Sequence, residues 1–229
     1  MQPQDWQAIW LSLRVGLLCL ILIFLPGIAI GWLLARREFF GKTVFEALVH
    51  APLVLPPVVT GYLLLVVLGR QGLVGQFIYR WFGVTISFSF VGAVLAAAVV
   101  SFPLMVRSTR LGFELTNPKL EIAAATLGAN PFRVFCTITF PLSLPGVLTG
   151  MVLAFVRSVG EFGATITFAG NIEGQTRTLP LAVYTYLQIP GRENAVWMLS
   201  MVAVLMSLLA LIYSERLTQK RHVLLRGRR

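Results

Sequence analysis

The sequence is poor in charged residues and in the side chains from which active sites are built. Asp and Glu together number 9 among 229 residues, with only 2 His and 2 Cys. Charged residues make up 12% of the chain, against roughly a quarter in an ordinary soluble domain. The sequence has no paired carboxylates, no His/Cys cluster and no glycine-rich phosphate loop. We therefore expect neither an enzyme nor a chain that binds a cofactor.

The few Cys and His residues are isolated from one another. Cys19 and Cys136 lack the spacing of a disulfide framework or a zinc site, and we expect both to be packing residues. His50 and His222 have no neighbouring ligands, so we expect no metal site.

The sequence is rich in long apolar runs, and 57% of its residues are hydrophobic. A transmembrane helix needs about 20 apolar residues. The runs cover residues 11–35, 45–68, 91–106, 144–162 and 195–212. They predict an all-α polytopic bundle of about five transmembrane helices, with residues 1–229 as a single transmembrane domain. The first ten residues carry no Lys or Arg, so we expect no cleaved signal peptide.

Prolines interrupt three of the runs. Pro26 is expected to kink the first helix, and Pro103 to break the third one just before Arg107. Pro56 and Pro57 together force a break in mid-membrane, which is tolerated only where protein or a water-filled cavity covers the freed carbonyl groups. This break is either a packing kink or part of a cavity wall.

The net charge of +10 would suggest nucleic-acid binding in a soluble protein, but in a membrane protein it reports topology. Four basic residues fall on one side of the five runs: Arg70, Arg80, Arg177 and Arg192. Thirteen fall on the other: Arg36, Arg37, Lys42, Arg107, Arg110, Lys119, Arg133, Arg216, Lys220, Arg221, Arg226, Arg228 and Arg229. The positive-inside rule therefore predicts an external N-terminus and a cytoplasmic C-terminus, with the basic tail near lipid headgroups and no nucleic acid as partner. We expect the connection 69–90 to lie at the membrane interface.

The central cytoplasmic connection, about residues 107–143, carries a recognisable spacing. Five positions resemble the EAA loop of bacterial ABC-importer permeases: Ala123, Ala124, Gly128, Ile138 and Pro141. Ile122 and Phe140 depart from it, standing where Glu and Leu are usual. We expect Glu121 to take over the acidic role at the helix start, where a carboxylate also favours the helix dipole.

The resemblance extends over nearly the whole chain. Residues 55–62, 157–165 and 170–180 look like the molybdate permease and its sulfate relatives. The resemblance implies a type I permease fold in the bacterial inner membrane, with a homodimer forming the pore by alternating access. It also implies two copies of a cytoplasmic ATPase, which would bind ATP, and a periplasmic molybdate-binding protein. A sulfate, thiosulfate or tungstate permease stays open as an alternative, as does an ion-coupled secondary carrier.

Candidate pathway residues cluster around the fourth run and the proline break. Arg157 and Glu161 stand four residues apart on one helix face, as an internal ion pair or as a gate that contacts the anion. The other candidates are Pro56, Pro57, Gly163 and Thr165. A polar loop is expected after this run, either solvated or part of the outer gate, with its hydroxyl groups facing water or protein.

Overall fold

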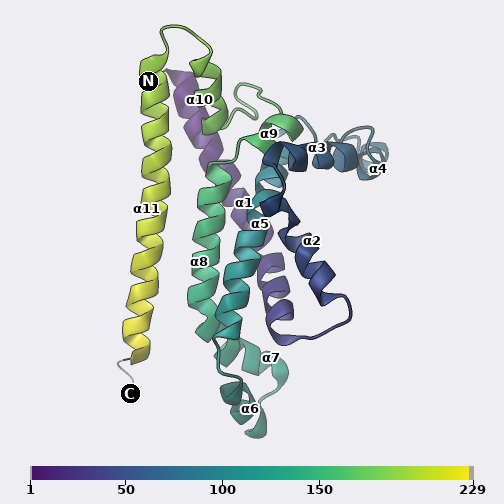
Figure 1. Cartoon of the computed structure of the whole chain (residues 1–229), viewed down its shortest axis with the longest axis vertical. Coiled ribbons are helices and arrows are strands. Elements are labelled where there is room, and N and C mark those ends of the chain that lie inside the picture. Colours follow the sequence, from purple (N-terminus) through teal and green to yellow (C-terminus); the bar gives the residue numbers. More distant parts are fainter. Residues whose placement is uncertain (1, 227–229) are drawn as a thin grey trace.

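The computed structural model describes residues 2–226, and these contain no strand. Four of the helical segments are long and apolar enough to cross a membrane, and a bent helix pair makes a fifth candidate span. The four run along the long axis of the molecule (Figure 1): α1 (Pro3–Arg36), α5 (Phe90–Glu114), α8 (Phe140–Val159) and α11 (Glu193–Arg226). The expected all-α bundle of about five spans is confirmed. Arg228, Arg229 and the side chain of His222 lie outside the described residues.

The core lies where α1, α5 and α8 pack together. Val15 and Cys19 of α1 meet Ala97 of α5 and Ala154 of α8 in one buried cluster. Small residues let the helices approach closely, as expected for the third run. Cys19 is a packing residue as predicted, whereas the same prediction for Cys136 is wrong because Cys136 is exposed.

The closest crossing is between α5 and α8. A Cβ atom placed on Gly146 would lie 2.7 Å from the Cα atom of Gly112. Because real Cβ atoms do not approach this closely, both positions require glycine to keep the two backbones in contact.

Two prolines, Pro26 and Pro103, lie inside long helices, and neither ends its helix. Helix α1 continues past Pro26 to Arg36, as predicted. The prediction that Pro103 ends the third span is wrong, because α5 continues to Glu114 and includes Arg107. Pro103 is buried among neighbouring helices, and such packing compensates for the one backbone donor that proline removes.

The second apolar run is not a straight span. It forms α2 (Lys42–Val54) and α3 (Pro57–Leu68), bent by 116° at the break between them. Helix α2 rises beside α5, and α3 lies across the end of the bundle where the N-terminus is found (Figure 1). The predicted break at Pro56 is confirmed.

Short helices cover the two ends of the bundle. The end opposite the N-terminus carries α6 (Pro118–Thr126) and α7 (Pro131–Val134), and the π-helix η1 (Phe135–Thr139) joins α7 to α8 (Figure 1). The N-terminal end carries α4 (Leu73–Phe82), α9 (Gly163–Phe168) and α10 (Leu179–Leu187). Residues 163–193 were expected as a loop, but α9 and α10 form within them. Polar side chains of the segment between these two helices bond to one another and to α10. The fourth apolar run was expected to begin at about residue 144, but α8 begins at Phe140, and the candidate span that includes it begins at Pro131.

Candidate functional site

The central connection consists of two short capped helices. The side chain of Asn117 accepts a hydrogen bond from the amide of Lys119 at 3.0 Å and begins α6. Gly128, at φ +85°, ends the turn that follows α6, since this conformation is costly for residues with a side chain. Asn130 then accepts from the amide of Arg133 at 2.8 Å and begins α7. Local sequence thus fixes the shape of this segment.

Glu121 fastens α6 to the bundle. It lies in the first turn of α6, as predicted. Its Oε1 atom accepts from the Arg36 guanidinium at 2.8 Å and from the Thr139 hydroxyl at 2.9 Å. Arg36 also donates to the carbonyl of Thr116 at 3.1 Å. The carboxylate therefore links α6 to the end of α1 and to η1, a role that sequence reasoning missed.

The remaining EAA-type positions lie on the outer side of this segment. Ala123, Gly128 and Pro141 are exposed, while Ala124 and Ile138 are half-buried. Large apolar side chains stand beside them in the open: Leu120, Ile122, Leu127 and Phe132. Leu127 is 89% exposed and Phe132 is 76% exposed. An apolar surface at the polar end of a membrane bundle is a feature of protein interaction sites.

Arg157 and Glu161 form the predicted ion pair near the other end of α8. Nη1 of Arg157 lies 2.5 Å from Oε2 of Glu161, whose side chain is 1% exposed. Oε1 of Glu161 accepts from the amide of Ala164 at 2.7 Å. The carboxylate therefore both neutralises Arg157 and fixes the start of α9. The Arg157 side chain is 28% exposed, so its guanidinium is only partly enclosed.

The proline break packs directly on α9. A Cβ atom on Gly163 would lie 2.9 Å from Cβ of Pro57, and one on Gly61 would lie 2.7 Å from the carbonyl oxygen of Ala164. The structure thus brings Pro57 and Gly163 together at the junction that Glu161 stabilises. Pro56 and Pro57 are exposed. Thr165 is 1% exposed and lies inside the bundle.

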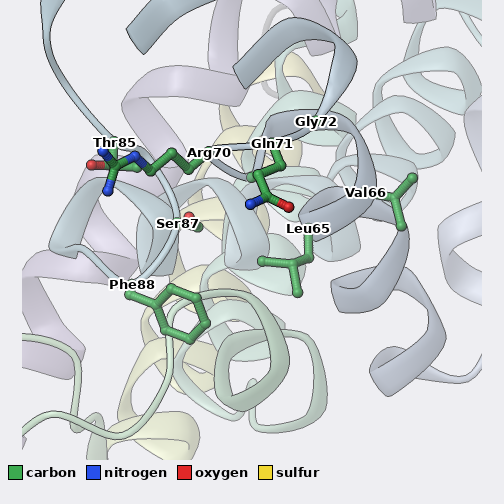
Figure 2. Close-up of a pocket in the computed structure, with 9 residues that line it drawn as sticks. Leu65, Val66, Arg70, Gln71, Gly72, Thr85, Ser87 and Phe88 are labelled. Carbon is green, nitrogen blue, oxygen red and sulfur yellow. The ribbon is translucent and has the colours of Figure 1, made fainter. Parts of the chain in front are cut away.

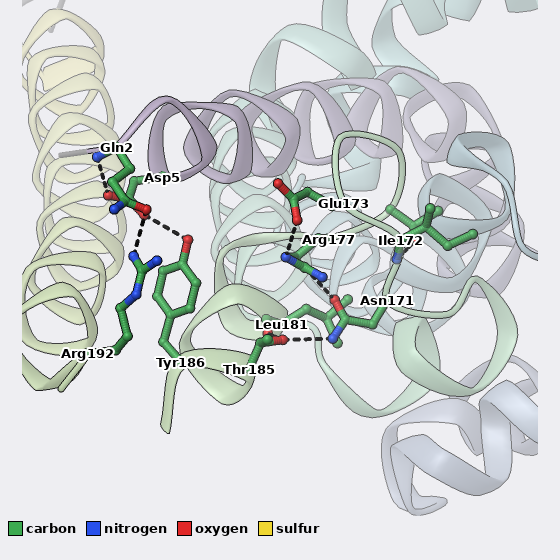
Figure 3. A network of polar contacts seen from close by, with 11 residues as sticks. Gln2, Asp5, Asn171, Ile172, Glu173, Arg177, Leu181, Thr185, Tyr186 and Arg192 are labelled. Atoms are coloured by element: carbon green, nitrogen blue, oxygen red, sulfur yellow. Dashed lines mark hydrogen bonds and ion pairs between the residues drawn. The ribbon is translucent and has the colours of Figure 1, made fainter. Parts of the chain in front are cut away.

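A polar network that the sequence did not indicate joins α10 to α1 (Figure 3). Asp5 is 2% exposed and accepts from the Tyr186 hydroxyl at 2.9 Å. Burial and the neighbouring carboxylate of Asp5 raise the pKa of Tyr186. Arg192 donates to the side-chain oxygen of Gln2 at 2.7 Å. In sequence, Asp5 resembles an ordinary acidic residue in a first helical turn, so nothing marked it as buried.

The hydroxyl and amide groups after α8 were expected to face water or protein, and Thr165, Thr176 and Thr178 are buried in protein. Asn171 donates to the Thr185 hydroxyl at 2.8 Å and accepts from Arg177 at 3.0 Å (Figure 3). Arg177 also pairs with Glu173 at 3.0 Å. These contacts hold the segment between α9 and α10 in place, although residues 172–175 within it are exposed.

A cavity of about 770 Å³ opens beside the turn between α3 and α4 (Figure 2). Arg70, Gln71, Ser87 and Phe88 line it. The Arg70 guanidinium donates to the Tyr79 hydroxyl at 3.0 Å and lies 4.5 Å from the centre of that ring. The cation is thus already engaged by α4.

Comparisons with known proteins agree over nearly the full length. A family model described as "Binding-protein-dependent transport system inner membrane component" matches residues 27–223. The chain is 54% identical over 215 residues to the "Molybdenum transport system permease protein ModB" of Escherichia coli K12, covering 94% of each chain. It is 40% identical over 206 residues to the "Putative molybdenum transport system permease protein YvgM" of Bacillus subtilis, covering 90% of each.

A solved structure supports the same fold. A chain of the MetNI methionine ABC transporter in inward-facing conformations superposes with a TM-score of 0.73 at 17% sequence identity, over 96% of this chain and 98% of that one. The predicted fold, that of the membrane subunit of a type I ABC importer, is confirmed.

Proposed function

The chain belongs to the family of binding-protein-dependent transport system inner membrane components, and we propose that it is the permease subunit of an ATP-driven importer of molybdate. Family membership makes it a multi-pass inner-membrane transport subunit. The observation that supports molybdate as the substrate is the 54% identity to the molybdenum permease ModB over 94% of both chains.

We further propose that two copies of the chain enclose the pathway, with α2 and α3 facing it. Helix α2 buries none of its residues within the chain. Val54 at the break is 84% exposed and Val58 just after it is 54% exposed. A membrane helix that is this open in the single chain needs lipid or a second subunit against it, and the irregular backbone at Pro56 requires protein or a water-filled cavity.

The proposed contact with the ATPase is the outer face of α6 and α7. Leu127 and Phe132 present apolar surface, and the small exposed residues Ala123 and Gly128 leave room for a partner to approach. Because Glu121 fastens α6 to α1 and η1, movement of α6 is passed to the spans. The proposed coupling residues are Glu121, Ala123, Ala124, Gly128, Ile138 and Pro141. Family membership implies the ATPase and the binding protein as partners, and we propose two ATPase copies.

The proposed gate lies where α3, α8 and α9 meet: Pro56, Pro57, Arg157, Glu161, Gly163 and Thr165. Arg157 would attract an oxyanion while the carboxylate of Glu161 prevents tight trapping, since a transport path must release what it binds. The excess of basic residues at the α6 end supports a cytoplasmic location for that end and an external N-terminus.

The test is uptake of molybdate into proteoliposomes that contain the chain, its candidate ATPase and its binding protein. Gly128→Glu places a charge on the proposed ATPase contact and is expected to abolish uptake while the subunit still inserts in the membrane. Gly41→Glu is the matched control, because Gly41 has a similar φ of +80° and nothing within 4 Å.

Three outcomes would contradict the proposal. Uptake that runs on an ion gradient without ATP would favour a secondary carrier. Equal competition by sulfate, thiosulfate or tungstate would remove molybdate as the specific substrate. Loss of uptake in both glycine variants would show that backbone strain, not docking, explains the defect.

A further inference from the structure

An open groove runs along α1 near the N-terminal end of the bundle. Its volume is about 710 Å³. Leu11 and Arg14 begin its α1 wall, and Leu17, Leu18 and Ile21 continue that wall along the helix. Phe90 at the start of α5 and Gln175 form part of the remaining wall. None of the residues that line the groove is Asp or Glu.

Among the residues that the structure describes, Arg14 has no acidic partner. Among the hydrogen bonds and ion pairs of the described residues, none involves Arg14. Its guanidinium lies 5.1 Å from the centre of the Trp10 ring. A cation beside an apolar membrane surface is costly unless it finds a counter-charge or reaches the interface. The groove therefore presents one uncompensated positive charge above an apolar wall.

The position of Arg14 along the membrane normal follows from its neighbours. Helix α5 crosses the membrane and begins at Phe90, after its N-cap Ser89, and both residues border the same groove. Arg14 thus lies at the depth where α5 enters the membrane. Trp6 and Trp10 are exposed on α1, and tryptophan is enriched at this depth. From Arg14 to Ile21 the helix extends roughly 10 Å into the hydrocarbon region.

We propose that this groove binds one anionic phospholipid, whose phosphate pairs with Arg14 and whose acyl chain lies along Leu17, Leu18 and Ile21. The guanidinium matches a phosphate in charge and geometry, and the apolar wall below it matches a fatty acyl chain. A zwitterionic headgroup would bring an ammonium group for which the groove offers no carboxylate. A second copy of the chain fits less well, because an identical face would bring another cation and no acid.

The proposal needs only that the chain spans a membrane, so it does not depend on molybdate as substrate. The groove lies at the N-terminal end of the bundle, and the orientation given under the proposed function would place the bound lipid in the outer leaflet. If uptake of molybdate fails while the lipid still binds, only the proposed function is contradicted.

The test is lipid cross-linking at the groove. A benzophenone-bearing side chain replaces Ile21, which is 71% exposed, and the full chain is placed in vesicles of equal parts phosphatidylglycerol and phosphatidylethanolamine. After illumination, the attached lipid is identified by mass. Both lipids bring a phosphate to Arg14, but only phosphatidylethanolamine brings an ammonium group beside that cation, so we expect phosphatidylglycerol to exceed phosphatidylethanolamine by about tenfold, a difference of about 1.4 kcal/mol.

Substitutions of Arg14 test whether its charge, and not a change in folding, sets the lipid preference. Arg14→Gln is expected to remove the preference, and Arg14→Lys to retain most of it. Arg37→Gln is the matched control, because Arg37 lies over Trp32 at 5.8 Å at the other end of α1 and its loss should leave the cross-link unchanged. Equal attachment of both lipids in the parent chain, or an unchanged preference in Arg14→Gln, would overturn the proposal. Cross-linking to a second copy of the chain would overturn it by showing that the groove is a subunit interface.

Discussion

Neutralising Glu121 tests the attachment of α6 most directly. The Glu121→Gln substitution keeps the shape of the side chain but removes the charge that holds Arg36 at 2.8 Å. The amide oxygen still accepts from one donor, so the change weakens the link among α6, α1 and η1 without creating a cavity. We expect α6 to detach locally while the bundle stays folded, because no core side chain is altered.

The size of the effect follows from burial. The side chains of Arg36 and Glu121 are 16% and 24% exposed. An exposed ion pair contributes about 0–1 kcal/mol, and breaking a fully buried one costs about 3–5 kcal/mol. This partly buried pair lies between these limits, at about 2 kcal/mol. That corresponds to a change of roughly thirtyfold in the ratio of detached to attached α6.

Hydrogen exchange in detergent or nanodiscs measures this ratio. Amides of residues 119–127 are expected to exchange roughly thirtyfold faster in Glu121→Gln, with α5 unchanged, and coupled uptake should fall. Glu38→Gln is the control, since Glu38 pairs with Lys42 at the same end but is 88% exposed. If α6 exchanges at the parent rate in both variants, the ion pair does not fasten the helix and the reasoning fails.

Three further predictions concern the opposite end. Gly163→Ala should lower the free energy of unfolding by about 1–3 kcal/mol through overpacking, measured by thermal unfolding in detergent. Gly160→Ala, whose Cβ would meet nothing closer than 3.6 Å, should change it little. Arg157→Met should destabilise the chain by about 3 kcal/mol by leaving a buried carboxylate unpaired. Adding Glu161→Gln should restore stability; if uptake also returns, Arg157 is only an ion-pair partner and makes no anion contact. Because the pKa of Tyr186 is raised in the folded state, the contribution of Tyr186 to stability should be constant below about pH 10, the usual tyrosine pKa, and should be lost above it. Tyr186→Phe should be less stable at neutral pH and lack this fall, and an unchanged alkaline fall would refute the assignment.

Local properties of the sequence were enough to predict the spans and the break between α2 and α3. Hydropathy over about 20 residues identifies a membrane helix, and two adjacent prolines remove backbone donors wherever they occur. The start of α6 was also predictable, because Asn117 and Glu121 act within one helical turn. The EAA-type spacing located the candidate coupling loop for the same reason.

Contacts between distant parts of the chain were not predictable in this way. Arg36 and Glu121 are 85 residues apart, and Asp5 and Tyr186 are 181 apart, so no local pattern connects them. The continuation of α5 through Pro103 depends on packing by other helices. The sequence placed both members of the Arg157–Glu161 pair because they are neighbours on one helix, but it gave no sign that Glu161 also bonds the start of α9.

The glycine contact between α5 and α8 has a mechanical consequence. Residues 131–159 form one continuous helical rod through η1 and α8, and Gly146 touches Gly112 near its midpoint. By helix rise, the rod extends roughly 20 Å from this pivot in each direction. A tilt about the pivot therefore moves the two ends by similar distances in opposite senses. An inward push where α7 ends would become an outward swing where Glu161 stands, and spin labels at the two ends would have to change their distances from α5 with opposite signs.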